Sequence, residues 1–232
     1  MVLGISVGVT YFSLAYELGY NVDLTLLSIA IVFPLVFNIR GAFRRREKAL
    51  EHLSRFRSSL KTLYFYVQMG TELTPEDKAK SEALIGNISD LTLLHLKKNP
   101  GEAKAVDDAI NELHYFILQS EEGIPRRIRD RMFRYLNDLQ EGFENLHAIN
   151  THRTPKALKA YCLVFIFVFP LIYAPNIVFN IGVSNSDLVI YFIVVVTEFI
   201  LISLYNIQDQ MEYPFDEVGL DDIQLENFGI DR

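Results

Sequence analysis

The 232-residue sequence contains no tryptophan and only one cysteine, Cys162, which lies inside a hydrophobic run. A single cysteine cannot form an intrachain disulfide framework, and it cannot supply a thiolate metal site. Basic residues are also in deficit, with a formal net charge of −7. Nucleic acid is therefore disfavoured as a partner, because phosphate binding needs a surplus of Lys and Arg on one face.

Charged residues are almost missing from two long stretches. Residues 1–39 and residues 160–206 contain no Lys or Arg, and each stretch has only two acidic residues. All but one of the 22 basic residues lie between them, in residues 40–159. Helices of a soluble protein need a polar face, so this pattern indicates membrane helices. The alternative is that these runs are buried core helices of a soluble protein, which their pairing around a charged middle disfavours.

Four apolar segments approach the length that crosses a bilayer, about 20 residues with roughly 17 as a lower limit. They are residues 2–18, 24–39, 158–172 and 188–207, and the first is the weakest of the four because Ser, Thr and Gly residues interrupt it. No basic n-region or small-residue cleavage motif accompanies the first segment, so we expect it to stay in the mature protein. The sequence predicts an all-α membrane protein with four transmembrane helices.

The connections between paired spans, residues 19–23 and 176–187, contain no Lys or Arg. The positive-inside rule then places both termini and the charged middle in the cytoplasm, with the spans in the plasma (inner) membrane. We expect four regions: transmembrane helices 1 and 2, a cytoplasmic helical domain, transmembrane helices 3 and 4, and an acidic cytoplasmic tail, at residues 1–40, 41–157, 158–207 and 208–232.

The cytoplasmic domain is expected to be a helical bundle inserted between the two pairs of spans. Apolar residues at 3–4 spacing extend the second span to about residue 68, and Thr74-Pro75 reads as an N-cap followed by a first helical proline. Breaks are expected at Asn99-Pro100-Gly101 and Gly123-Ile124-Pro125. The Arg-rich residues 126–134 alternate with apolar ones, which favours a solvated amphipathic helix over a ligand site.

No catalytic, nucleotide-binding or metal-binding motif stands out in the sequence. As candidate metal ligands, four of the five histidines are not spaced as metal pairs: His95, His114, His147 and His152. We therefore expect neither enzymatic activity nor a cofactor. Pro34 within the second span removes one helical hydrogen bond and frees the carbonyl of Ala30, which predicts a bend packed against protein or facing a cavity.

Two stretches resemble a known family. One contains Thr154-Pro155, then Tyr161, then a Phe-rich run ending at Pro170-Leu171. The other follows the last span, and its characteristic residues are Glu212, Pro214, Phe215, Asp221 and Asp222. Together they resemble the bestrophin pattern, in which Glu-Asn-Pro-Phe-Gly is followed by Asn-Asp-Leu-Pro-Leu. The order of spans, helical domain and acidic tail matches as well.

The chain departs from that pattern at Tyr213, where the family has Asn, and at Asp216, where it has Gly. The run of acids that holds calcium in animal members is interrupted by residues 218–220. Hard cations need several converging oxygens, so we expect no high-affinity calcium site. The alternative reading of these acids is a solvated tail.

The resemblance implies a homopentameric ion channel whose second membrane helix lines a narrow apolar neck. Helical spacing of four selects Thr25, Ile29, Phe33 and Phe37 for this neck, and the family's second, cytoplasmic constriction would fall at Ile128 or Met132. The implied activity is passive conduction of small inorganic ions, with anions such as chloride favoured by the family. The alternative reading is that these side chains pack against neighbouring helices.

Two other functions remain open. One is a membrane-anchored interaction or scaffold protein that does not conduct, and the other is a small transporter, which the lack of an internal repeat disfavours. Glu198 is an acid well inside a span, and such a residue is a functional candidate by default. It is equally compatible with a protonated carboxyl or with a hydrogen bond between helices.

Overall fold

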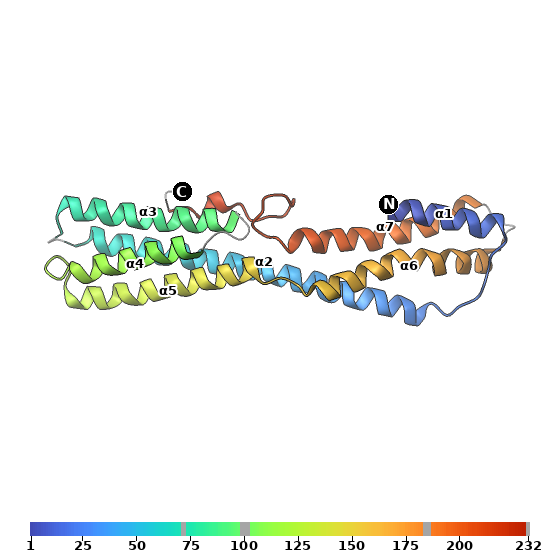
Figure 1. Ribbon diagram of the computed structural model, residues 1–232, viewed down its shortest axis with the longest axis horizontal. Helices are drawn as coiled ribbons and strands as arrows, with labels where there is room; N and C mark the ends of the chain where they lie inside the picture. Colours follow the sequence, from blue (N-terminus) through green and yellow to red (C-terminus); the bar gives the residue numbers. More distant parts are fainter. Residues whose placement is uncertain (71–72, 98–102, 183–186, 231–232) are drawn as a thin grey trace. The chain divides into compact units, whose positions relative to one another are not determined.

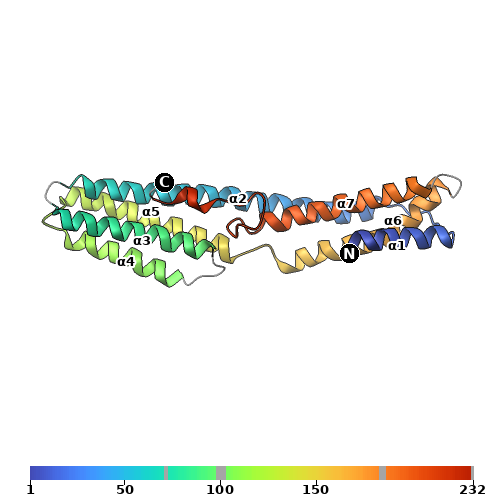
Figure 2. The ribbon, with the colours of Figure 1, turned by 90° about the horizontal axis from the view of Figure 1, so that it is seen from above.

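The computed structural model describes residues 1–70, 73–97, 103–182 and 187–230, and these residues form helices with no strand among them (Figure 1, Figure 2). The all-helical prediction is therefore confirmed. The expected break at Asn99-Pro100-Gly101 and residues 183–186 of one predicted connection lie outside the described residues. The elements are α1 (Val2–Ala15), α2 (Thr25–Gln68), α3 (Pro75–Lys97), α4 (Ala103–Gln119), α5 (Arg126–Thr151), α6 (Lys156–Ile181), α7 (Asp187–Met211) and a 3₁₀ turn (Leu225–Phe228).

The chain divides into two compact units. The first, here called the apolar unit, comprises Met1–Phe43 and Thr154–Glu212; the second, the polar unit, comprises Arg44–Arg153 and Tyr213–Arg232. Helix α2 is continuous through residue 43, so it contributes its first part to the apolar unit and the rest to the polar unit.

In the apolar unit, α1 packs on α6 and α7, and α6 packs on α7. By length and composition, three described helical stretches could cross a membrane: Thr25–Gln68, Arg126–Ile181, whose apolar part is α6, and Asp187–Met211. These stretches make the chain an integral membrane protein. The predicted first span is a shorter helix, Val2–Ala15 of 14 residues, and at 1.5 Å per residue it is about 21 Å long. It ends early because Glu17 has a φ of 51°, outside helical geometry.

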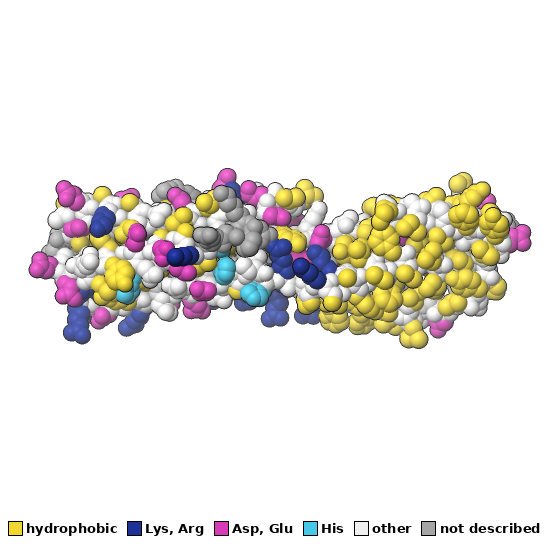
Figure 3. All heavy atoms as spheres, viewed as in Figure 1, with side chains coloured by type: hydrophobic (Ala, Val, Ile, Leu, Met, Phe, Trp, Pro, Cys, Tyr) yellow, Lys and Arg dark blue, Asp and Glu magenta, His cyan; other side chains and the backbone are white. Residues whose placement is uncertain are grey.

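Helix α1 has its polar residues inside and its apolar residues outside. Ser6, Thr10 and Ser13 are buried, whereas Tyr11 and Phe12 are exposed. The hydroxyls of Ser6 and Thr10 donate to carbonyls of their own helix, those of Val2 at 3.2 Å and Ser6 at 2.7 Å. On the face shown in Figure 3, hydrophobic side chains cover nearly all of the apolar unit. Small polar residues between helices and apolar residues facing outward are typical of a protein surrounded by lipid.

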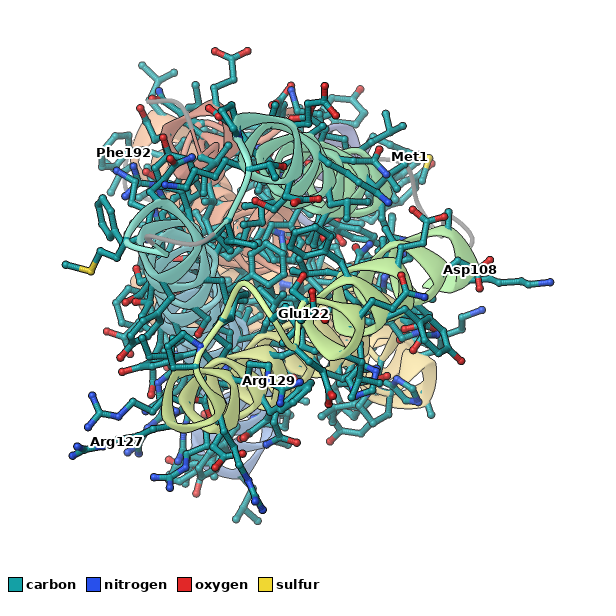
Figure 4. The ribbon with its side chains drawn as sticks, turned by 90° about the vertical axis from the view of Figure 1, so that its left-hand side faces the viewer. Met1, Asp108, Glu122, Arg127, Arg129 and Phe192 are labelled. Atoms are coloured by element: carbon teal, nitrogen blue, oxygen red, sulfur yellow. The ribbon has the colours of Figure 1, made fainter. Side chains whose placement is uncertain are left out.

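The polar unit is a bundle of α3, α4, α5 and the second part of α2 around one hydrophobic core. Phe56, Leu63 and Phe143 are fully buried in it. Gly142 of α5 lies against α2, since a Cβ added there would be 3.4 Å from the Cβ of Phe56, an ordinary van der Waals distance. Viewed end on in Figure 4, Arg127 of α5 points away from the bundle.

The predicted start of α3 is confirmed. Pro75 is its first residue, and the hydroxyl of Thr74 accepts a hydrogen bond from the backbone N–H of Asp77 at 3.1 Å. The first turn of the helix contains two acids, Glu76 and Asp77, and the helix dipole favours negative charge at this end.

Candidate functional site: the exposed face of helix α2

The four residues predicted for the pore neck share the outer face of α2. Thr25 is exposed, and the side chains of Ile29, Phe33 and Phe37 are 47%, 57% and 61% exposed. We call this row the α2 stripe. The rings of Phe33 and Phe37 lie 6.0 Å apart, so neighbouring turns present a continuous apolar surface.

The opposite face of α2 is buried within the apolar unit. Ile31 and Leu35 have almost no exposed surface and belong to a cluster with residues of α1, α6 and α7. Asn38, on the same buried face, donates to the sulfur of Cys162 at 3.3 Å. The helix is thus fixed about its own axis, and the α2 stripe belongs to the face left uncovered by the chain itself, together with Leu26, Val32 and Val36.

Pro34 lies in the middle of this segment, and the carbonyl that it frees has a partner. The hydroxyl of Tyr161 on α6 donates to the carbonyl oxygen of Ala30 at 3.3 Å. The freed carbonyl of Ala30 is therefore bonded to protein, and Tyr161, one of the residues that carried the family resemblance, receives a physical role.

Arg40 follows the α2 stripe on the same side of the helix, three residues after Phe37, and its side chain is exposed. A row of apolar side chains thus ends at a guanidinium group. Below an apolar constriction, such a group raises the local concentration of anions and lowers that of cations.

The two residues predicted for a cytoplasmic constriction are placed differently from the α2 stripe. Met132 is fully buried in the core of the polar unit, and Ile128 is partly buried against that core. In this conformation Met132 has no surface that an ion could meet. The alternation of Arg with apolar residues along α5 serves to pack this helix in the bundle.

Glu212, the first residue of the tail motif, is a buried acid with several partners. Its carboxylate accepts hydrogen bonds from the backbone N–H of Thr154 at 2.9 Å and from the ammonium group of Lys159 at 2.8 Å. Gln208 donates to the same carboxylate at 3.3 Å, and Lys159 also contacts Asp209. The motif residues Thr154 and Glu212, 58 positions apart in sequence, therefore join the start of α6 to the end of α7.

The acids Asp216, Glu217 and Asp221 are exposed, in agreement with the reading of a solvated tail, whereas the apolar residues of the tail are packed. Phe215, Ile223 and Leu225 are buried in the core of the polar unit, and Pro214 accepts a backbone hydrogen bond from Ile223 at 2.9 Å. Arg46 donates to the carbonyl of Asp221 at 2.7 Å. The three apolar side chains supply the burial that an acidic tail on its own would lack.

The acids of the tail bond to backbone N–H groups. Asp222 accepts from Gly219 at 2.8 Å, and Asp216 accepts from Val218 at 3.2 Å. Burial and the neighbouring Asp216 raise the pKa of Asp222 to about 6. A Cβ at Gly219 would lie 2.5 Å from a carboxylate oxygen of Asp222, so a larger residue there would displace that side chain. Among the described residues, no group of three or more His, Cys, Asp or Glu side chains could hold a metal ion.

Sequence spacing missed one pair of histidines that the fold brings together. Nε2 of His95 on α3 lies 3.0 Å from Nδ1 of His147 on α5, and both rings pack near Phe143. Asn150 donates to the carbonyl of His95 at 3.4 Å. The signal was absent from local spacing because the two residues come from different helices.

Solved structures of bacterial membrane proteins share this fold. A variant of a bacterial bestrophin homolog from Klebsiella pneumoniae matches with a TM-score of 0.82 at 14% identity, over 98% of this chain and 93% of that chain. Another structure of a bestrophin homolog from that organism matches with a TM-score of 0.81 at 14% identity, over 98% and 91%. A further variant gives 0.82 at 15% identity, over 97% and 92%. No protein-family model and no curated protein matches this sequence.

Proposed function

We propose that this protein, which has the bestrophin fold, is one subunit of a homo-oligomeric ion channel whose pore is lined by the α2 stripe. The resemblance seen in the tail motif is confirmed at the level of the fold, over nearly the whole chain. The observation that carries the functional proposal is the exposure of Ile29, Phe33 and Phe37 on a helix whose other face is buried.

An apolar row on one subunit becomes a conduit only when copies surround a common axis. We propose a pentamer, as the family resemblance implies, with five α2 stripes forming a ring of apolar side chains. Such a constriction controls conduction by excluding water and admitting partly dehydrated ions. The helices α2, α6 and α7 would cross the plasma (inner) membrane with the polar unit and both termini in the cytoplasm. Helix α1 would complete a four-span topology by lying against α6 and α7.

We further propose that the channel favours anions such as chloride. Arg40 supports this because it is exposed on the pore-lining side of α2, directly below Phe37. An apolar neck does not itself select a sign of charge, so the charged residues at its inner end would set the preference.

The test is conduction by the full chain reconstituted in liposomes. Replacing Phe33 by Ala should widen the constriction and increase the ion flux several-fold. Phe192→Ala on α7 is the matched control, because Phe192 is also an exposed phenylalanine, at 67%, and should leave the flux unchanged (Figure 4). In asymmetric salt, Arg40→Glu should shift the reversal potential toward cations.

Two results would contradict the proposal. One is a stable pentamer that conducts no ions, which would favour the membrane-anchored scaffold instead. The other is an equal response to Phe33→Ala and Phe192→Ala, which would mean that the α2 stripe contacts lipid or other helices. A mass measurement in detergent precedes both, since a monomer cannot enclose a central pore.

A further inference from the structure

Glu198 is a feature of the apolar unit that the proposed channel does not use. It lies near the middle of α7 with its side chain 1% exposed. Both of its carboxyl oxygens are buried and have no hydrogen-bond partner among the described residues. Its neighbours along the buried face of α7 are Val194, one turn before it, and Leu201, one turn after it. Leu201 belongs to an apolar cluster with residues of α1, α2 and α6.

A carboxylate in such surroundings has no partner that would offset the free-energy cost of burying its charge. Burying an ionised carboxylate without a partner is so costly that the group instead takes up a proton or binds a cation. The helices around Glu198 have the following titratable or charged groups: the N-terminal amine, Tyr11, Arg40, Lys156, Lys159, Tyr161, Cys162, Tyr173, Asp187, Tyr191, Tyr205 and Asp209. No hydrogen bond or ion pair joins any of these groups to Glu198 in the part of the chain described.

Three hydroxyl groups of α1 and α7 are engaged with carbonyls of their own helices. Thr197, the adjacent residue, donates to the carbonyl of Ile193 at 2.8 Å. Ser6 and Thr10, two of the three buried hydroxyls of α1, donate to carbonyls of their own helix. The carboxyl group of Glu198 thus has no hydrogen-bond donor among the described residues, and it belongs to no group of three or more His, Cys, Asp or Glu side chains there that could hold a metal ion.

We propose that Glu198 is a proton-binding site within the apolar unit, and that loss of this proton loosens the packing of α7 against α1 and α6. Helix α1 is the element most exposed to this change. It is short, and polar side chains form most of its buried face, so it has little apolar contact with which to tolerate a neighbouring charge. The inference rests on burial and missing partners, and it holds whether or not the protein conducts ions.

Thermal unfolding of the full chain in detergent, measured from acidic to alkaline pH, tests the proposal. The wild type should lose about 5 °C or more in its unfolding midpoint as the pH rises and the carboxyl ionises. Glu198→Gln preserves the shape of the protonated group and should abolish this part of the loss. Glu17→Gln is the matched control, because Glu17 is an exposed acid of the same unit and its replacement should leave the profile as in the wild type.

A wild-type profile without this loss, or a Glu198→Gln profile that retains it, would overturn the proposal. A second measurement applies even if the variant does not fold. Infrared spectra of wild-type protein labelled with isotopic glutamate should show the carbonyl band of a protonated glutamic acid at neutral pH, and the band should vanish in alkali. If no such band appears, Glu198 is not a proton-binding site.

Discussion

The two units of this protein expose opposite kinds of side chain. In the apolar unit, Ser6, Thr10 and Glu198 are buried while phenylalanines such as Phe199 are exposed. In the polar unit, Phe143 and its apolar neighbours are buried, and the acidic and basic side chains lie on the surface (Figure 3). Both units follow the same rule, which is that a side chain avoids the solvent that accommodates it poorly. The solvents differ, being lipid for one unit and water for the other.

This difference also sets what holds each unit together. The polar unit gains stability from removing apolar area from water, so its core is large and continuous. In lipid that gain is absent, and helices associate through close packing and hydrogen bonds. The bonds from Asn38 to Cys162 and from Asn176 to the carbonyl of Val22, the latter at 2.8 Å, are of this kind.

The largest expected effect comes from the same substitution made once in each unit. Phe143→Ala removes a fully buried ring from the core of the polar unit and should cost about 3–5 kcal/mol of unfolding free energy. Phe199→Ala removes an exposed ring from α7 and should change the stability in detergent by no more than about 0.5 kcal/mol. Thermal unfolding measures both variants. Equal losses of unfolding free energy in the two variants would contradict the claim that Phe143 is a core residue and Phe199 is not.

The second prediction concerns Lys159, which has one buried and one exposed acidic partner. Glu212 is almost fully buried, so Glu212→Ala leaves the ammonium group and the N–H of Thr154 poorly compensated and should cost about 3–5 kcal/mol. Asp209→Ala removes an acid whose side chain is 49% exposed and should cost no more than about 1 kcal/mol. Denaturation in detergent distinguishes them. A larger loss for Asp209→Ala would contradict the role assigned to Glu212.

The third prediction concerns the solvent around each unit, which an arginine placed on an exposed position of each unit would distinguish. Ile200 is exposed near the middle of α7, and Phe65 is exposed on the part of α2 in the polar unit. Ile200→Arg should oppose membrane insertion by about 2.5–3.5 kcal/mol, whereas Phe65→Arg meets water and should be nearly neutral. The amount of folded protein recovered from the membrane fraction measures this. If both variants insert like the wild type, α7 does not face lipid at residue 200.

Much of this architecture is predictable from the sequence because charge patterning is a strong signal. A bilayer tolerates few ionised groups, so the charge-free stretches indicated where apolar helices lie. The helix start at Pro75 followed from the local chemistry of Thr74 and Asp77. The tail motif indicated the fold, although only 14% of residues are identical to the solved bestrophin homolog.

What the sequence did not predict depends on contacts between distant segments. The burial of Met132, the packing of Phe215 in the polar unit and the pairing of His95 with His147 each join residues from different elements. Periodicity identifies a face of a helix, but it does not say what covers that face. The early end of α1 at Ala15 was missed because a backbone change at Glu17, rather than a loss of hydropathy, stops the helix.

The smallest expected effect is a pH dependence of stability that comes from a pair of acids in the polar unit, Asp216 and Asp222. Asp222 has an ordinary pKa of 3.8 and a pKa of about 6 in the folded chain, chiefly because of burial and secondly because of Asp216. Between these values the folded chain holds a proton that the unfolded chain has released, so stability should fall as the pH rises through this window. Because the group is partly solvated, we expect a loss of about 1 kcal/mol.

Asp222→Asn should remove this loss, since an amide beside Asp216 carries no charge at any pH. Asp221→Asn is the matched control: Asp221 is an exposed neighbour whose backbone carbonyl, not its side chain, bonds to Arg46. Chemical denaturation at about pH 4 and about pH 7 measures the three proteins. If the Asp222→Asn variant still loses stability as the wild type does, the titrating group lies elsewhere. Because Asp222 is partly solvated and Glu198 is not, the loss removed by Asp222→Asn should be smaller than that removed by Glu198→Gln.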